Sequence, residues 1–495
     1  PTIIEAVDSK LYTWTMNEMA PIVGEPAMPP TRDVVPCLYY SIQKDHYCMH
    51  TKLKPMYEKR FELTDAVKSK VDELTKDCKT LNEKIAKLYY FCQQEIRYIS
   101  IKSNLASNQV GHPAEETLNN KYGDCTDKGM LLAVMLKHIG VEAYPVLILT
   151  NNSGKAIREI GIFDSNHCIT EVHLDGRVFY LDATATDYRY PYFRSDDHET
   201  SAMNVMLATI RTVPLPPPED NTNISTRRIT LEKDGTTHIE LESETNGSKE
   251  AMMRGFTRNL KPEEYEKVVR RSISAQTADY KLELATHTDP LDFDTPFTTK
   301  SSYTLNRFAT KSGRYMIFSV PYFELDFPEV SLEKRNFEIQ HSTSASQIDK
   351  LTIKLPENFV VKYLPPAIRV QSPYVEFEMI YDQQGDEIII NRKMAFPVRH
   401  IPVSDYQTYK ADLEKIAHSS KQKIFLEEMP AKQEEKSPIG TATPEITIPE
   451  QNVGTTETSA VETSATATSS VSSAPQDITA SSTAETVENQ EGTKK

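Results

Sequence analysis

The first half of the chain shows the spacing of apolar residues that is typical of packed helices. Between residues 55 and 96, apolar positions recur every three or four residues, which places them on one side of a helix. Thr80 and Glu83 have the spacing of a capping box, so one helix is expected to begin there. A later helix is predicted over 125–139 and is ended by Gly140.

Shorter apolar patterns follow this helix and predict strands. The run 141–150 is typical of a buried strand. Residues 167–184 predict a hairpin, because two alternating segments flank Asp175 and Gly176, a pair that two-residue turns favour.

The loop length of this hairpin decides which side chains share a face. If Asp175 and Gly176 alone form the loop, the numbers of paired residues sum to 351, and Asp182 faces Ile169. His167 and Asp182 are then diagonal neighbours on one side of the sheet, roughly 7 Å apart at Cα. A three-residue loop would instead place Asp182 on the opposite side.

The second half of the chain has the alternation expected of a β-rich region. Strand-like segments occur from residue 224 to about 396, and 375–378 faces 387–390 across a Gln-Gln-Gly turn. One helical insertion interrupts them over roughly 249–274, and a helix from 404 to about 425 ends the folded part.

Composition shifts and proline runs divide the chain, and a helix-rich segment followed by a strand-rich one indicates an α+β fold class. The tail has no aromatic residue and cannot bury enough apolar surface to fold. The expected parts are 1–45, the C-terminal part of an N-terminal β-rich domain whose beginning is absent; 55–200, an α+β core; 201–221, a proline-rich linker; 222–427, a β-rich domain with a helical insertion and a C-terminal helix; and 428–495, a disordered tail rich in Ser, Thr, Ala and Glu.

Charge and hydropathy exclude two broad classes. The net charge is −15 and no basic stripe interleaved with aromatic residues occurs, which argues against nucleic-acid binding. No run of 18 apolar residues is present, so no transmembrane segment is expected in this chain. Because the pattern of structured sequence starts directly at Pro1, we expect a removed signal peptide or an incomplete N-terminus.

The six cysteines show no C-x-x-C pair, which argues against a zinc site. Cys37 and Cys48 are the only candidates for a disulfide, although two unpaired buried thiols are the favoured interpretation. Cys92 lies on the apolar stripe of a helix and is expected in the core. Cys168 should point to the strand face opposite its neighbour His167 and serve in packing.

Cys125 differs from the others, because it stands where a glycine-led turn enters a helix. A helix N-terminus offers free N–H groups and a partial positive charge, which stabilise a thiolate. Asp124 is the expected N-cap, and Asp127 and Lys128 are expected in a solvated first turn. Against this, a lone cysteine is usually a small buried hydrophobe.

A base and an acid follow at compatible places. Alone, His167 would more often be structural, and Asp182 could merely cap a turn. With Cys125 they form a nucleophile, a base and an orienting acid, the arrangement of a cysteine acyl-transfer site. The backbone N–H of Cys125 would be one oxyanion donor, and Gln109 is the candidate for the second.

These residues resemble the transglutaminase-like superfamily, which has a papain-like Cys-His-Asp order. The resemblance places the nucleophile, base and orienting acid of that family on Cys125, His167 and Asp182. Thr126 departs from the lysine expected at its position in the bacterial subgroup. The motifs that carry the resemblance are Tyr122–Lys128, Leu131-Leu132 through Gly140-Val141, Asn166-His167 and Leu181–Thr184.

The resemblance implies a papain-like core with a helix-borne cysteine and a strand-borne His/Asp pair, followed by a β-rich, sandwich-like domain. Residues 1–45 and 222–425 resemble the β-rich domains that flank this core in bacterial proteins, which suggests the cell envelope or periplasm. The implied function is acyl transfer on an amide bond of a protein or peptide, by hydrolysis or transamidation. No metal or other cofactor is needed for it.

The alternative is a non-catalytic interaction scaffold, in which the core and the flanking β domains bind a protein or a cell-surface polymer. Most of the residues lie outside the predicted core, which is compatible with such a role. The sequence does not indicate the substrate or the oligomeric state.

Overall fold

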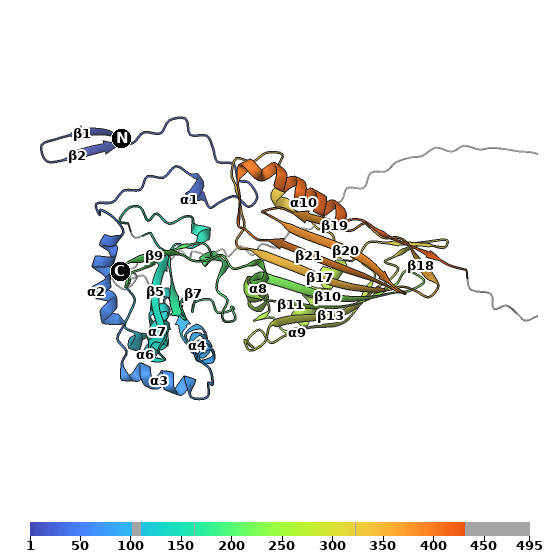
Figure 1. Ribbon diagram of the computed structural model, residues 1–495, viewed down its shortest axis with the longest axis horizontal. Helices are drawn as coiled ribbons and strands as arrows, with labels where there is room; N and C mark the ends of the chain where they lie inside the picture. Colours follow the sequence, from blue (N-terminus) through green and yellow to red (C-terminus); the bar gives the residue numbers. More distant parts are fainter. Residues whose placement is uncertain (101–109, 163, 322, 431–495) are drawn as a thin grey trace, which may run out of the picture. The chain divides into compact units, whose positions relative to one another are not determined.

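The computed structural model describes residues 1–100, 110–162, 164–321 and 323–430 (Figure 1). Two large hydrophobic clusters form the interior of these segments. One gathers side chains from residues 49–205, and the other gathers side chains from residues 229–426. Of the helices in these segments, none combines the length and the apolar character that a membrane crossing requires.

Helices make up the first part of the core. Thr80 caps α4 and shares a capping box with Glu83, which confirms the predicted helix start. The helical region begins earlier than the predicted residue 55. Helix α2 starts at Tyr47, and Pro55 lies inside it. The helices are α2 (Tyr47–Arg60), α3 (Asp65–Thr75), α4 (Leu81–Tyr90), the π-helix η1 (Phe91–Glu95), α6 (Ala114–Asn120) and α7 (Cys125–His138).

A five-stranded antiparallel sheet completes this core. Its order is β7-β6-β5-β8-β9, so the chain's last two core strands pair beside β5. The strands are β5 (Glu142–Ile148), β6 (His167–Leu174), β7 (Arg177–Leu181), β8 (Ser201–Asn204) and β9 (Thr209–Thr212).

The β6–β7 hairpin has the predicted two-residue loop. Leu174 pairs with Arg177, which confirms the register derived from the sequence. Asp175 and Gly176 have φ angles of 50° and 74°, the left-handed conformation that a type I′ turn requires at both positions.

Helix α7 packs on β5 and β6 and is enclosed on all sides (Figure 1). The sequence indicated one apolar face, yet every residue from Thr126 to Leu136 is buried. Gly129 faces β6, where a Cβ would lie 3.4 Å from the Sγ atom of Cys168, an ordinary van der Waals distance. Cys92 and Cys168 are both buried in the core, as predicted.

The second half of the chain is built on an eight-stranded sheet of order β12-β13-β11-β10-β17-β21-β20-β19. Only the β10–β17 pair is parallel. The strands are β10 (Thr222–Leu231), β11 (Thr237–Thr245), β12 (Tyr280–His287), β13 (Phe297–Leu305), β17 (Ala345–Lys354), β19 (Ile368–Gln371), β20 (Glu376–Gln384) and β21 (Glu387–Phe396).

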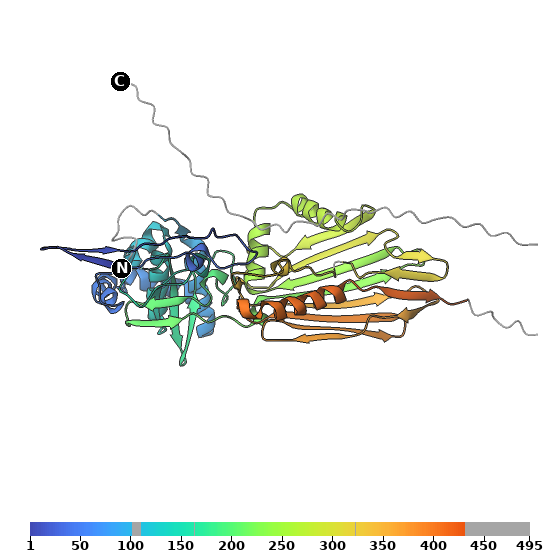
Figure 2. The same cartoon turned by 90° about the horizontal axis from the view of Figure 1, so that it is seen from above.

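A four-stranded sheet and three helices accompany the large sheet, and Figure 2 shows α10 running along it. Side chains of both sheets and of α10 share the second hydrophobic cluster. The smaller elements are β14 (Thr310–Ser312), β15 (Tyr315–Phe318), β18 (Phe359–Tyr363), β23 (Ile424–Glu428), α8 (Gly247–Thr257), α9 (Pro262–Ser274) and α10 (Tyr406–Ser420), with β16 (Ile339–Gln340) pairing β22 (His400–Ile401).

The predicted helical insertion is present and consists of two helices, α8 and α9. Two other details of the predicted β-rich region are corrected. The last helix ends at Ser420, and residues 424–428 form a strand between β15 and β18. The Gln-Gln-Gly hairpin exists, but 387–390 pair with 381–384, because the strands are longer than the quoted segments.

The N-terminal region contains one exposed hairpin, β1 (Thr2–Glu5) with β2 (Lys10–Thr13), and a short helix α1 (Thr31–Val34). Residues 37–41, within the region 1–45 that was expected to be β-rich, form no strand. Cys37 and Cys48 are free thiols, exposed and half-buried respectively, so the expectation that they are unpaired holds and the expectation that they are buried is wrong.

Residues 24–43, which we call the strap, contact both the α+β core and the β-rich region. Glu25 accepts hydrogen bonds from the backbone N–H groups of Asn336 and Phe337, at 2.8 and 3.3 Å, and lies 3.4 Å from Arg335 Nε. Further along, Arg32 donates to Asp164 at 2.7 Å, and the Ser41 hydroxyl donates to the carbonyl of Gly161 at 2.6 Å.

Candidate active site

Cys125 is the first residue of α7, and Asp124 separates it from a two-residue strand β4 (Tyr122–Gly123) that pairs with β3 (Arg97–Tyr98). Asp124 is the N-cap, as predicted, and its Oδ1 accepts from the N–H groups of Thr126 and Asp127. Asp127 Oδ2 returns the contact by accepting from Asp124 N at 3.0 Å. This reciprocal capping box fixes the start of the helix and leaves Cys125 half-buried.

Asp127 and Lys128 do not form the predicted solvated turn, because the start of α7 lies inside the protein. Asp127 is buried and also accepts from the backbone N–H of His112 at 2.6 Å. Lys128 has no exposed surface, and its Nζ donates to the carbonyls of Gln93 and Ile96 at 3.2 and 2.8 Å. These carbonyls belong to the end of η1, which explains why a lysine is tolerated there.

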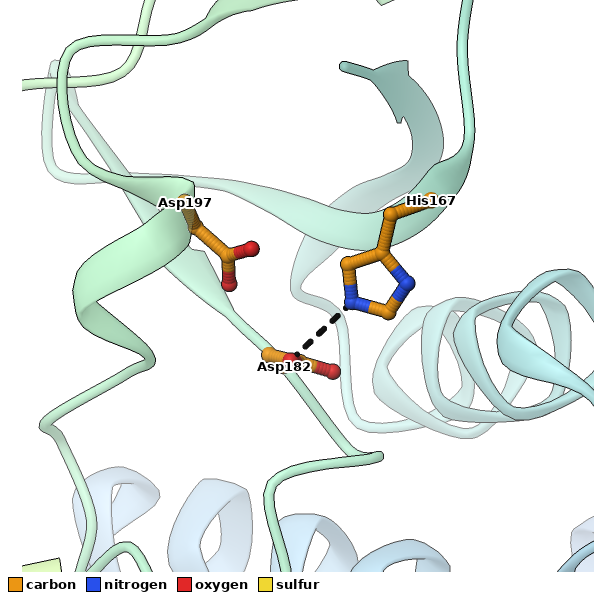
Figure 3. A group of neighbouring side chains, drawn as sticks. All are labelled: His167, Asp182 and Asp197. Carbon is orange, nitrogen blue, oxygen red and sulfur yellow. Dashed lines mark hydrogen bonds and ion pairs between the residues drawn. The ribbon is translucent and has the colours of Figure 1, made fainter. Parts of the chain in front are cut away.

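His167 begins β6, and Asp182 directly follows β7. The two side chains meet on one side of the hairpin, where His167 Nε2 lies 3.1 Å from Asp182 Oδ2 (Figure 3). The other carboxylate oxygen accepts from the N–H and the hydroxyl of Thr184, at 2.8 and 2.7 Å. Asp182 is therefore held at both oxygens and aimed at the imidazole.

Charge pairing outweighs burial at both residues. Burial acts to raise the pKa of Asp182, but the charge and hydrogen bond of His167, with help from Arg194 and Thr184, lower it to about 2. Burial acts to lower the pKa of His167, yet Asp182, Cys125 and Asp197 raise it well above the ordinary value. The pair is thus set up to hold an imidazolium against a carboxylate.

The remaining ring nitrogen is free to serve the thiol. Figure 3 shows that Nδ1 of His167 points away from the carboxylates while Nε2 faces Asp182. Cys125 is among the groups that raise the pKa of His167, which indicates that its thiol lies near this imidazole. Of the three residues that the sequence singled out, His167 and Asp182 are in direct contact, and Cys125 stands at the start of α7. Gln109, the candidate second oxyanion donor, lies outside the described residues.

A fourth residue, Asp197, joins this group and was missed by the sequence analysis. It ends a short 3₁₀ helix, η3 (Ser195–Asp197), and its carboxyl group lies beside His167 and Asp182 (Figure 3). Asp197 has no exposed surface, and neither of its oxygens has a hydrogen-bond partner. Burial, reinforced by the charge of Asp182, raises its pKa well above the ordinary value. No motif or spacing rule points to it, since it follows the hairpin by an irregular loop.

Within the described segments, His167, Asp182 and Asp197 form the group whose donor atoms, all within 4.8 Å of one another, could hold a metal ion. Two observations favour an ion pair instead. His167 and Asp182 are already hydrogen-bonded to each other, and the guanidinium of Arg194 lies 3.9 Å from Asp182 Oδ2.

Comparison with known proteins gives two family matches. The chain matches the transglutaminase-like superfamily over residues 68–183 and a domain of unknown function, DUF3858, over residues 314–426. No curated protein matches it.

Two solved structures are similar to parts of the chain. One, described as a "putative protease" from Parabacteroides distasonis, is 11% identical with a TM-score of 0.47, over 76% of this chain and 58% of that one. The other, a "putative cysteine protease" from Cytophaga hutchinsonii, is 16% identical with a TM-score of 0.21, over 27% of this chain and 42% of that one. The chain thus spans less than two thirds of the length of either structure.

The predicted fold class is confirmed: an α+β core is followed by a β-rich region. The chain contains a transglutaminase-like core domain and, after it, a DUF3858 domain.

Proposed function

We propose that this protein is a cysteine acyl-transfer enzyme that acts on an amide bond of a protein or peptide. In this proposal Cys125 is the nucleophile, His167 the proton-transfer group and Asp182 the acid that orients it. The observation that carries the proposal is the hydrogen bond between His167 Nε2 and Asp182 Oδ2, which leaves Nδ1 for a thiol at the start of α7.

In the first half-reaction, the Cys125 sulfur attacks the carbonyl carbon as a thiolate, and the proton that it has given up is held on His167 Nδ1. The new C–S bond creates an oxyanion, and the proposed first donor to it is the backbone N–H of Cys125. The C–N bond then breaks as His167 returns the proton to the leaving amine. A thioester remains on Cys125.

In the second half-reaction, His167 takes a proton from water or from a second amine, and that nucleophile attacks the thioester. The C–S bond breaks and the proton returns to the Cys125 sulfur. Water completes hydrolysis, whereas a lysine amine completes a cross-link. The activity measurement below separates hydrolysis from cross-linking.

The test compares the wild type with Cys125→Ala, His167→Ala and the control Cys37→Ser, an exposed thiol outside the site. We expect iodoacetamide to alkylate Cys125 at least tenfold more slowly in His167→Ala than in the wild type, because the imidazole stabilises the thiolate. Mass spectrometry of the cysteine peptides measures this rate directly. Cys37→Ser should leave it unchanged.

Activity is measured with β-casein, with and without a fluorescent primary amine. Peptide fragments would indicate hydrolysis, and incorporated fluorescence would indicate transamidation. Cys125→Ala should abolish either product. Equal alkylation rates in the wild type and His167→Ala, together with no turnover, would contradict the proposal and favour the non-catalytic scaffold.

A further inference from the structure

Three aspartates in the described segments have no exposed surface: Asp182, Asp197 and Asp349. Asp349 lies between two arginines, with Arg392 Nη2 at 2.8 Å and Arg227 Nη2 at 3.5 Å. Asp182 is held by His167 and Thr184. Asp197 differs from both, because its oxygens accept from no donor. A buried polar group without a partner costs stability, so its presence beside the imidazole needs a reason.

Asp197 lies beside a second buried carboxyl group, that of Asp182. Two carboxylates that share a buried site cannot readily both ionise, so the pair retains a proton. Asp182 has the better claim to the negative charge, because it contacts His167 and lies 3.9 Å from Arg194. Arg194 Nε donates a hydrogen bond to Asp196 Oδ1 at 2.9 Å, so the guanidinium neutralises Asp196 and not Asp197.

We propose that Asp197 is a positioning residue that remains a neutral carboxylic acid behind the His167–Asp182 pair. Its O–H is then the donor that faces the Asp182 carboxylate, so two acids and one proton support the imidazole. The described groups that face Asp197 are Asp182 and His167 from the hairpin, and Arg194 and Asp196 from its own segment. The consequence for catalysis rests on the proposed function, whereas the protonation state does not.

The first experiment detects the proton on Asp197 directly and does not depend on enzymatic activity. Infrared spectra at pH 8 are compared for the wild type, Asp197→Asn and the control Asp349→Asn. We expect a carbonyl band of a protonated carboxylic acid that disappears in Asp197→Asn and persists in Asp349→Asn. If the band is the same in the wild type and Asp197→Asn, Asp197 is ionised and the proposal is wrong.

The second experiment measures stability against pH. Because the folded-state pKa of Asp197 is raised, its contribution is fully present below the ordinary value of about 3.9 and is lost as pH rises toward the folded value. Asn keeps the neutral shape without this loss. The thermal midpoint of Asp197→Asn should therefore gain on that of the wild type as pH rises from about 4 to 8. A gap that is constant with pH would contradict the proposal.

The third experiment tests positioning through the alkylation rate of Cys125. We expect Asp197→Ala to lower this rate about tenfold, in line with the loss of one hydrogen bond, and Asp197→Asn to restore most of it. The pH profile of Asp197→Asn should match the wild type. A profile displaced by about one pH unit would show that Asp197 carries a charge.

Zinc distinguishes the remaining interpretation. If Zn²⁺ raises the thermal midpoint of the wild type but not that of Asp197→Asn, the cluster is a metal site and the proposal is overturned. The infrared and stability measurements can also be made in Cys125→Ala. A failure of the proposed function would therefore leave the Asp197 result intact, and a failure at Asp197 would leave the Cys-His-Asp proposal intact.

Discussion

His167 is the residue on which the chemistry and the electrostatics of the site converge. One ring nitrogen is fixed by Asp182, and the ring interacts with Cys125. Its side chain is almost wholly buried, which would favour the neutral form, yet the pKa is raised because Asp182 and its neighbours outweigh burial. The raised pKa means that the folded structure favours the charged form of His167.

This predicts a specific pH dependence of stability. A histidine whose folded pKa is raised contributes stability that is fully present below its unfolded pKa of about 6.5 and is lost as pH rises through the folded value. The free energy of unfolding of the wild type should fall over this range, whereas His167→Gln should lack that component. Urea unfolding at pH 6, 7.5 and 9 measures the difference. Equal slopes in the two proteins would contradict the prediction.

Single residues were predictable where local chemistry decides them. Cys125, His167 and Asp182 stand in recognisable positions, and Asp124 has the residue type of an N-cap. Asp197 was not predictable, because it reaches the site through an irregular loop that no periodicity describes. Lys128 was misjudged because its environment comes from η1, which is distant in sequence, and a charged residue in a first turn is normally exposed.

At the scale of elements, the hairpin shows how far local rules extend. Asp175 and Gly176 determine the turn type, the turn fixes the register, and the register places Asp182 on the face of His167. The last strand shows the opposite case. Residues 424–428 continue an apolar pattern that follows a helix, but they become a strand because β15 and β18 pair with them from both sides. Pairing between distant segments overrides local propensity there.

The cap of α7 carries the second prediction. Asp127→Ala removes the acceptor for the N–H groups of Asp124 and His112, both near the nucleophile. We expect this change to lower the free energy of unfolding by about 1–3 kcal/mol, since two donors lose their partner at a helix start. Urea denaturation gives the value.

Asp65→Ala is the matched control for this cap, because Asp65 is also an acid in the first turn of a helix but is fully exposed. It should change stability little. The alkylation rate of Cys125 should fall in Asp127→Ala and not in Asp65→Ala. An equal effect of the two substitutions would contradict the role assigned to Asp127.

At the scale of the whole described molecule, the strap is one of the segments that contact both the α+β core and the β-rich region. Direct contacts such as Arg189 with Glu250 also join these two regions. Its Glu25 side chain is buried and satisfies backbone donors of Asn336 and Phe337 beside Arg335. The core-side contacts of Arg32 and Ser41 lie less than 20 residues away. Through these hydrogen bonds and ion pairs, the strap contributes to the stability of both the α+β core and the β-rich region.

Breaking one of its anchors gives the third prediction. Glu25→Ala leaves Arg335 and two backbone donors without their carboxylate, and we expect a loss of about 2–3 kcal/mol in the free energy of unfolding. Glu5→Ala, which removes an exposed pair with Lys10, is the control and should have almost no effect. Limited proteolysis should also cut the strap faster in Glu25→Ala. Unchanged protease sensitivity would contradict this assignment.

The enclosure of Lys128 gives the protein a reporter of its own motions. Reagents such as acetic anhydride acylate accessible amines, and they will modify surface lysines such as Lys155 at once. The amine of Lys128 can react only when the first turn of α7 separates from the carbonyls of Gln93 and Ile96. Its acylation rate in the native protein therefore measures how often the first turn of α7, which carries Cys125, opens, and the measurement needs no substrate.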